Sequence, residues 1–317
     1  MVADGPLRIV FFGTPAFALA TLDALLASRH HVVGVVTRPD RPRGRGQKVV
    51  DSPVKARAVE TRLQLLQPTA LKDPSFTRAL TTLAPDLGVV AAYGRLLPDS
   101  SLAVPRLGLI NVHASLLPKY RGAAPVHRAV IAGERETGVT IMRVVKTLDA
   151  GPMIRSATRP IGPEETSAEI ERDLARLGAR LLVSVLDDVA AGTAKETPQD
   201  ETAATYAPPL RKDEGAVAWS LAAPAIHNMI RGLHPWPHAF THVDGRRLVL
   251  LRSAVPGLPA AGPPGVVMAS RGDVLRVATG AGAIDLIEIQ PEGRRPMTVR
   301  DFLAGHRIAT GDRLTSR

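Results

Sequence analysis

The sequence predicts an α/β protein with a mostly parallel sheet in its N-terminal two thirds and a small β-barrel in its last third. Two patterns lead to this prediction. In the first part, continuous apolar and β-branched runs alternate with helical periodicity, as in a parallel sheet that helices cover on both faces. In the last part, short strand-like runs follow one another between glycines and prolines, which favours a barrel or sandwich.

The N-terminal part begins with a buried-strand run over residues 8–12 that ends at Gly13. A helical stretch over 15–27 follows, and a proline is tolerated in its first turn. A long helix is expected over 166–191, where Thr166 and Glu169 have the spacing of a capping box. Further strands are expected at 31–37, 63–66, 86–92, 107–113, 138–145 and 153–160. This order of elements predicts a Rossmann-like sheet.

The composition changes after the long helix. Residues 192–213 combine prolines and threonines without sustained periodicity, which indicates a linker. The expected strands of the last part lie at 247–254, 265–269, 274–279 and 283–290. We therefore expect one domain over 1–206, which includes the start of the linker, and a second over 207–317.

The chain has 317 residues and no cysteine, which excludes disulfides, thiolate metal sites, iron–sulfur clusters and cysteine nucleophiles. Its hydrophobic fraction of 45% is that of a globular protein rather than a disordered or fibrous one. No apolar run approaches the roughly 18–20 residues of a membrane-spanning helix, and the N-terminus lacks the pattern of a signal peptide. We expect the protein to be cytoplasmic and monomeric.

The net charge of +10 is unevenly distributed. Residues 1–206 and residues 207–317 each carry a net charge of +5, although the second part is about half as long. Residues 38–48 hold five basic side chains and one acidic side chain, so the rest of the first part is almost neutral. This segment follows a strand at the carboxyl edge of the sheet, where open α/β sheets bind ligands. It is either a solvated basic loop or a contact for a phosphate backbone.

A polar pair occurs at the end of the predicted strand 107–113. Asn111 and His113 are two residues apart, so both side chains point to one face of the strand. The amide can donate to a developing oxyanion, and the imidazole can move or share a proton near neutral pH. The alternative interpretation is a hydrogen-bonded pair that braces the following turn.

An imidazole in this role needs a carboxylate to orient it, and Asp149 is the candidate. It lies in Leu148-Asp-Ala-Gly-Pro152, a sharp turn between two predicted strands. An isolated Asp-Ala-Gly is also ordinary turn chemistry, and spacing alone does not bring this residue to His113.

Two other segments match ligand-binding motifs only in part. Residues 12–17 have the first glycine of a dinucleotide-binding fingerprint but neither of the others, so NAD binding is not expected there. The histidines of 234–242 are separated by Pro235 and Pro237, which disfavour the helix that would align them on a metal. We expect a packed turn with Trp236 as its anchor, and no metal.

The motif Asn111-x-His113-x-Ser-Leu-Leu-Pro118, then Arg121-Gly-Ala-Ala-Pro125, then Asp149, resembles the folate-dependent formyltransferases. The resemblance extends over nearly the whole chain, because further segments are similar to a member of the family that acts on tRNA. These segments are 12–15, 38–42 with 44–46, 52–55, 91–94, 136–141 and 235–237. One departure is Ala114, where many relatives have glycine, a difference of one methyl group.

The resemblance implies that the chain transfers a formyl group from 10-formyltetrahydrofolate to the α-amino group of methionine on initiator tRNA. Asn111 and protonated His113 would stabilise the oxyanion that forms when the amine attacks the formyl carbonyl. Asp149 would hold His113 and help to relay the proton of the amine, directly or through water. The wall of the folate site would include Ser115, Leu116, Leu117 and Pro118.

The resemblance also implies contacts with tRNA. The basic loop would hold the acceptor end, and the second domain, which resembles an oligonucleotide-binding (OB-like) barrel, would add backbone contacts. The residues in the loop and the linker are Arg38, Arg41, Arg43, Arg45, Lys48, Arg211 and Lys212. The candidates in the second domain are Arg246, Arg247, Arg294 and Arg295, the first two of which are equally well explained as charges of a hairpin turn.

Two alternatives remain open. Another folate-dependent formyltransferase or hydrolase would share the catalytic residues, but would not be expected to need both the basic loop and the second domain. A non-catalytic RNA-binding protein on the same scaffold would have no use for Asn111, His113 and Asp149 together.

Overall fold

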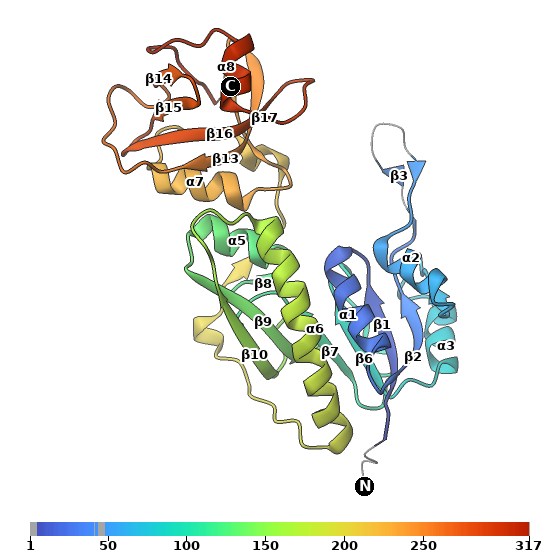
Figure 1. Cartoon of the computed structure of the whole chain (residues 1–317). Coiled ribbons are helices and arrows are strands. Elements are labelled where there is room, and N and C mark those ends of the chain that lie inside the picture. The colour runs from blue at the N-terminus through green and yellow to red at the C-terminus, as the bar shows by residue number, and fades with distance from the viewer. Residues whose placement is uncertain (1–4, 41, 44–47, 317) are drawn as a thin grey trace. The chain divides into compact units, whose positions relative to one another are not determined.

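The structure is a computed structural model that describes residues 5–40, 42–43 and 48–316. The chain divides into two compact units, and Figure 1 labels many of their elements. The first unit consists of Met1–Pro125, Thr137–Arg159 and Glu171–Ala207, and the second of Val126–Glu136, Pro160–Ile170 and Pro208–Arg317. Two short segments from before residue 171 thus belong to the second unit.

The first unit contains a seven-stranded sheet with the order β10-β9-β7-β6-β1-β2-β5. Its strands are β1 (Arg8–Gly13), β2 (His31–Val36), β5 (Leu65–Leu66), β6 (Leu87–Ala91), β7 (Leu109–His113), β9 (Glu136–Arg143) and β10 (Met153–Pro160). Neighbouring strands from β7 to β5 are parallel, and β9 runs antiparallel to β7. The predicted mostly parallel sheet is confirmed.

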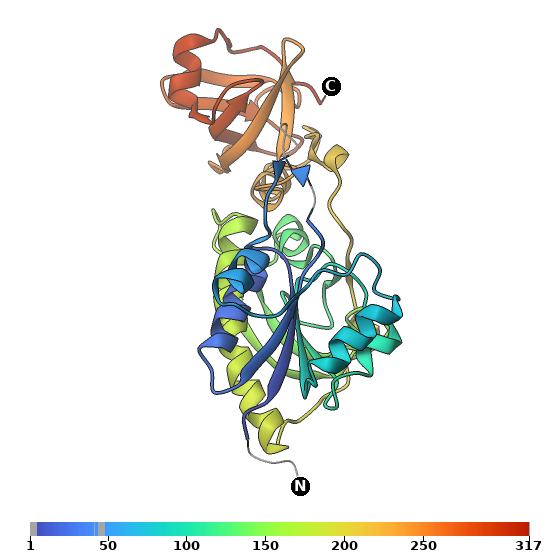
Figure 2. The ribbon, with the colours of Figure 1, turned by 90° about the vertical axis from the view of Figure 1, so that its right-hand side faces the viewer.

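Helices cover both faces of this sheet, as Figure 2 shows from the side. α1 (Ala16–Leu26) and the long α6 (Ser167–Ala191) lie on one face, and α3 (Pro74–Thr82) lies on the other. The first unit also contains α2 (Pro53–Glu60) and α4 (Asp99–Leu102), whereas all of α5 (Pro125–Ala132) except Pro125 belongs to the second unit. Among the described residues, no helix is both long and apolar enough to cross a membrane.

The packing explains the apolar runs of the sequence. A Cβ atom built on Gly178 of α6 would lie 2.7 Å from the side chain of Val112 on β7, so only a glycine lets the helix approach the sheet this closely. On the opposite face, Phe76 and Leu80 of α3 belong to one buried cluster with Phe12 of β1. Burial on both faces is the reason why these strands read as continuous apolar runs.

The predicted capping box is present at the start of α6. The backbone N–H of Thr166 donates to Oε2 of Glu169 at 2.7 Å, and the backbone N–H of Glu169 donates to Oγ1 of Thr166 at 3.4 Å. The two side chains thus satisfy backbone donors that the first turn of a helix cannot pair by itself.

The segment predicted to be a linker is ordered by contacts within the first unit. Thr197 exchanges two backbone hydrogen bonds of 2.8 Å with Met153 of β10. Farther along, β11 (Tyr206–Ala207) pairs in parallel with the short strand β8 (Arg121–Gly122). A one-residue bridge and two-residue strands carry no periodicity, so these contacts left no pattern in the sequence.

The second unit contains an antiparallel sheet with the order β12-β13-β16-β15-β14, and β17 pairs with β16. The four predicted strands correspond to β13 (Arg246–Ala254), β14 (Val267–Arg271), β15 (Val274–Ala278) and β16 (Ala283–Pro291). Four elements were not predicted: α7 (Ala223–Gly232), β12 (Ala239–Val243), β17 (Met297–Thr298) and α8 (Val299–Gly305).

The C-terminal segment joins the two edges of this sheet. Thr315 exchanges backbone hydrogen bonds of 2.8 and 3.0 Å with His242 of β12. Gly311 and Asp312 bond to Val267 of β14 at 2.9 and 2.8 Å. Edge strands left unpaired tend to associate with other chains, and here one segment covers both edges in a barrel-like arrangement.

The prediction that Trp236 anchors a packed turn was wrong. The turn is present, but Trp236 is 48% exposed. The buried tryptophan of this unit is Trp219, which is 4% exposed and whose indole N–H donates to Oγ1 of Thr241 at 3.1 Å. Trp219 belongs to the core cluster formed by α7, α8 and the sheet. The prolines on either side of Trp236 explain the turn without burial of the ring.

Candidate active site

The polar residues of β7 lie where an open α/β sheet usually binds its ligand. β1 has β2 on one side and β6 on the other, so the order of strands reverses beside β1. Ligands in such sheets bind at the carboxyl ends of the strands near this reversal. Asn111 and His113 occupy the carboxyl end of β7, which is the neighbour of β6.

The imidazole of His113 contacts a polar atom through each ring nitrogen. Its side chain is only 5% exposed. Nε2 lies 3.0 Å from the carbonyl oxygen of Tyr120, and Nδ1 lies 3.6 Å from Oδ2 of Asp149. Since a carbonyl oxygen only accepts, Nε2 must carry the hydrogen of the first contact. The second distance is too long for a hydrogen bond, which leaves Nδ1 able to bond to a substrate atom or water.

The carboxylate of Asp149 is held by the backbone of β8. Its Oδ2 accepts a hydrogen bond of 2.8 Å from the N–H of Gly122. Gly122 has φ = +116°, and a Cβ atom there would lie 2.8 Å from the carbonyl oxygen of Ala207. No other residue fits this position without moving β11. Asp149 itself has φ = +48°, which a non-glycine residue adopts at an energetic cost.

Asn111 offers an amide without a protein partner. The residue is half-buried, and it lies between Val90 of β6 and Met142 of β9 in the sheet register. Its side chain makes no hydrogen bond to any residue in the described part of the chain. A half-buried amide normally finds a partner, so this amide is available to a ligand.

The four residues of the predicted folate wall divide into two pairs. Ser115 is 1% exposed, and its hydroxyl donates to the carbonyl oxygen of Lys119 at 2.6 Å. Leu117 is 8% exposed, and its N–H donates to Oγ1 of Thr140 at 3.2 Å. These two residues fix the turn after β7. Leu116 and Pro118 are partly exposed and supply the apolar surface of the motif.

The basic loop is fixed at its base. The carboxylate of Asp40 accepts from Lys55, which also pairs with Asp51 at 2.8 Å, and from Nε2 of Gln67 at 3.0 Å. The hydrogen bond from Lys55 holds the pKa of Asp40 below its usual range. The one acidic charge of the loop is therefore neutralised by Lys55, which lies outside it.

The basic residues of the loop are described only in part. The backbone N–H of Arg38 donates to Oγ1 of Thr14 at 3.4 Å, and Thr14 is the residue that follows β1. Arg43 on β3 (Pro42–Arg43) pairs in register with Lys48 on β4 (Lys48–Val49). Arg41 and Arg45 lie outside the described residues.

The basic residues of the linker differ in their surroundings. Arg211 is 72% exposed and lies 3.4 Å from Asp213 and 3.8 Å from Glu214. Lys212 is exposed and makes no ion pair with any described residue. Exposed pairs of this kind contribute little to stability and are easily exchanged for a phosphate.

Among the C-terminal arginines named from the sequence, Arg246 and Arg247 follow the hairpin turn at Asp244 and Gly245. The guanidinium of Arg247 lies 3.9 Å from the centre of the Phe240 ring, a cation–π contact within the hairpin. Arg294 and Arg295 lie in the exposed turn after β16.

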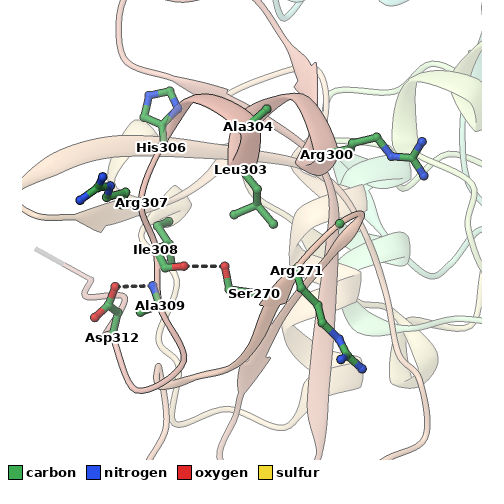
Figure 3. Close-up of a pocket in the computed structure, with 11 residues that line it drawn as sticks. Ser270, Arg271, Arg300, Leu303, Ala304, His306, Arg307, Ile308, Ala309 and Asp312 are labelled. Carbon is green, nitrogen blue, oxygen red and sulfur yellow. Dashed lines mark hydrogen bonds between the residues drawn. The ribbon is translucent and has the colours of Figure 1, made fainter.

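A pocket of about 660 Å³ opens in the second unit between the β14–β15 hairpin and α8 (Figure 3). Leu303 and Ile308 form its apolar part, and Ser270 donates to the carbonyl oxygen of Ile308 at 2.6 Å. Its basic residues are Arg271, Arg300, His306 and Arg307. Arg300 lies 3.5 Å from Asp273, whereas Arg271 and Arg307 make no ion pair with any residue that the structure describes.

Metal ligands are not grouped in the part of the chain that the structure describes, where no three His, Asp or Glu side chains converge. The rings of His234 and His238 lie 5.2 Å apart, edge to face. Burial lowers the pKa of both histidines, which favours the neutral form of each ring.

The sequence did not indicate the roles of Tyr120 and Gly122, which bond to His113 and Asp149 respectively. Both residues lie in or beside the Arg-Gly motif that carries the family resemblance. The motif thus marked this segment as important. It did not reveal these two roles, because both are played by backbone groups, which every residue has.

Two family models match the chain. The model described as formyl transferase matches residues 7–186, and the model described as formyl transferase, C-terminal domain, matches residues 209–307. The chain is 47% identical over 315 residues to the methionyl-tRNA formyltransferase of Heliobacterium modesticaldum, with 97% of this chain and 99% of the relative covered. It is 46% identical to the enzyme of the same name from Methylococcus capsulatus, with 97% of this chain and 99% of that relative covered.

Solved structures share the fold at lower identity. WlaRD, a sugar 3N-formyl transferase, is 16% identical with a TM-score of 0.69, and the match covers 91% of this chain and 99% of that one. HypX from Aquifex aeolicus, solved with tetrahydrofolic acid, is 19% identical with a TM-score of 0.65. The match covers 94% of this chain and 47% of HypX. At these identities the likeness shows the fold alone.

Proposed function

The chain belongs to the formyl transferase family, and from this premise we propose that it formylates the α-amino group of methionine on initiator tRNA, with 10-formyltetrahydrofolate as donor. The observation that carries the proposal is coverage. Relatives named methionyl-tRNA formyltransferase match both units at 46–47% identity, and almost no part of either chain is left over. The sugar 3N-formyl transferase WlaRD also matches 91% of this chain but at only 16% identity, so it is the identity over both units that favours the tRNA substrate.

The chemistry assigned to the site follows from its contacts. Addition of the amine to the formyl carbon places negative charge on the formyl oxygen, and the free amide of Asn111 is the donor available to it. The hydrogen on Nε2 of His113 is committed to Tyr120, so proton exchange with the substrate falls to Nδ1. Oδ2 of Asp149 lies 3.6 Å from Nδ1, so the carboxylate would hold the ring while the proton of the amine passes through Nδ1 to N10 of tetrahydrofolate, as the bond from N10 to the formyl carbon breaks.

The folate would lie against the turn after β7. Leu116 and Pro118 offer it apolar surface, while the buried Ser115 and Leu117 keep the turn in place. The faces of the folate rings can pack against this apolar surface, while the polar edge of the pterin requires hydrogen-bonding groups.

The acidic partner would be the tRNA, bound in the cytoplasm by a single copy of the chain. The basic loop, Arg211 and Lys212 supply positive charge from the first 212 residues. In the second unit we add Arg271 and Arg307 to the arginines named from the sequence, because neither is paired with a carboxylate among the described residues. Arginine suits phosphate because its planar guanidinium can donate two parallel hydrogen bonds.

The direct test incubates the protein with 10-formyltetrahydrofolate and methionyl initiator tRNA, and scores formyl-methionine after mild deacylation. Uncharged initiator tRNA and an amino sugar nucleotide are offered in parallel. Formylation of the charged tRNA alone is the expected result. Formylation of the sugar nucleotide, or release of formate without an acceptor, would overturn the proposal in favour of another member of the family.

A further inference from the structure

A single linker side chain holds both sides of the turn that carries Asp149. The Nε2 group of Gln199 donates one hydrogen bond to the carbonyl oxygen of Asp149 and another to that of Gly151, each at 2.8 Å. An amide group has two N–H donors, and here both are used on carbonyls two residues apart. Gln199 thus fixes the backbone from which the Asp149 carboxylate projects.

The orientation of this amide is set by a buried arginine. Nε and Nη2 of Arg121 donate to Oε1 of Gln199 at 3.0 and 2.8 Å. Arg121 is 1% exposed, and its guanidinium also makes two hydrogen bonds of 2.8 Å with the carboxylate of Glu201. A guanidinium only donates hydrogen bonds, so the amide of Gln199 must direct its oxygen toward Arg121. Its Nε2 group then faces the turn.

The turn needs such a restraint. Asp149 has φ = +48°, a conformation that costs a non-glycine residue free energy unless surrounding contacts hold it. The Cβ of a residue other than glycine at position 151 would lie 2.0 Å from the carbonyl oxygen of Arg143, so the turn is tightly packed on its other side. Arg121 and Gly122 therefore both act on Asp149. Arg121 orients Gln199, which holds the backbone of the turn, and the N–H of Gly122 donates to the Asp149 carboxylate.

We propose that Gln199 is a positioning residue of the transfer reaction, which acts through the Asp149 turn and is oriented by Arg121. The proposal rests on the function proposed above. Gln199 does not touch the candidate reacting groups. Its effect is to keep Oδ2 of Asp149 opposite Nδ1 of His113, where a displacement of about 1 Å costs a reaction roughly 100-fold.

The test uses Gln199→Glu, which keeps the shape of the side chain and the partner of Arg121. It replaces both donors to the turn by an oxygen that repels the two carbonyls. We expect kcat to fall about 10- to 100-fold, with KM for methionyl-tRNA nearly unchanged. Gln290→Glu is the matched control, because Gln290 also donates to a backbone carbonyl, that of Arg294 in the second unit. It should leave kcat unaltered.

A double-mutant cycle separates positioning from mere folding. In an Asp149→Asn background, Gln199→Glu should change kcat by less than about two-fold, because the residue through which it acts is already disabled. A loss in the double variant that equals the product of the two single losses would overturn the proposal, as would a single variant with wild-type kcat.

A readout without substrate keeps this test separate from the proposed function. In protein labelled with ¹⁵N-histidine, the ring resonances of His113 are recorded at a single pH. Gln199→Glu and Asp149→Asn should each displace these resonances from their wild-type positions, and Gln290→Glu should leave them in place. Coincidence of the Gln199→Glu resonances with those of the wild type would overturn the positioning role even if the chain formylates another substrate. Failure of the wild type to formylate tRNA would overturn only the proposed function.

Discussion

Nε2 of His113 lies 3.0 Å from the carbonyl oxygen of Tyr120, and this contact determines which edge of the ring can do chemistry. Nε2 carries a hydrogen as long as it bonds to this carbonyl oxygen, which can only accept. The other nitrogen, Nδ1, has no hydrogen bond to any residue that the structure describes, since Oδ2 of Asp149 is 3.6 Å away. We therefore expect any proton that the imidazole exchanges to pass through Nδ1, beside Asp149.

The first prediction concerns this proton. His113→Ala should lower the rate of formylation by about 100- to 10,000-fold, the usual contribution of a general acid or base. Affinity for methionyl-tRNA should remain nearly unchanged, because a residue that is 5% exposed adds little to the binding of a macromolecule. Single-turnover kinetics and filter binding measure the two effects. His31→Ala, at an exposed position on β2, is the control. Near-normal turnover in His113→Ala would remove the residue from the mechanism.

The second prediction concerns the basic loop. Arg41→Ala together with Arg43→Ala should weaken use of methionyl-tRNA and leave folate binding in place. Loss of two phosphate contacts should lower the slope of log affinity against log salt by about 1.5 to 2. Lys72→Ala with Arg78→Ala removes the same charge from exposed positions elsewhere in the first unit. If both pairs of substitutions weaken binding equally, the effect is one of overall charge and the loop is only a solvated segment.

Much of the fold could be predicted because its signals are local. The strand over 8–13 and the capping box of Thr166 and Glu169 depend on neighbouring residues, and both are present. The sequence also placed Asn111 and His113 on one strand face. It did not predict α7 or α8, and a seven-residue helix such as α8 offers only two turns of periodicity.

The contacts around Asp149 could not be predicted, because they join residues far apart in the chain. Gln199 is 50 residues from Asp149, and it lies in a segment whose composition indicates a linker. Arg121 stood in the motif that carries the family resemblance, but its partners, Gln199 and Glu201, are about 80 residues away. Such pairs emerge only when the chain is folded.

The third prediction concerns acid stability. Desolvation would raise the pKa of Glu169, but hydrogen bonds from Thr166 and the pair with Arg252 at 2.8 Å outweigh it and lower the pKa to about 2. The ionised form thus stabilises the fold fully above pH 4.5, and this contribution is lost as the pH falls from 4.5 toward 2. Glu169→Gln should cost about 1–2 kcal/mol at pH 7, after allowance for partial exposure of the side chain.

Tryptophan fluorescence reports on the unit concerned, because both tryptophans of the chain, Trp219 and Trp236, lie in the second unit with Glu169. Urea unfolding of wild type and Glu169→Gln should differ at pH 7, differ less at pH 3, and converge as the pH approaches 2. Glu292→Gln, in an exposed turn, should follow the wild type at every pH. A difference that stays constant from pH 7 to pH 3 would show that the carboxylate charge of Glu169 is not responsible.

The last prediction decides where the second unit meets RNA. Arg271 and Arg307 flank an apolar pocket (Figure 3) and have no carboxylate partner among the described residues, so nothing has to be broken before they meet a phosphate. Arg271→Ala with Arg307→Ala should lower the salt slope of tRNA binding by about 1.5 to 2. Arg294→Ala with Arg295→Ala removes equal charge from the turn after β16 and serves as the comparison. A larger effect of the second pair would place the contact at that turn, and the pocket would then have no part in binding tRNA.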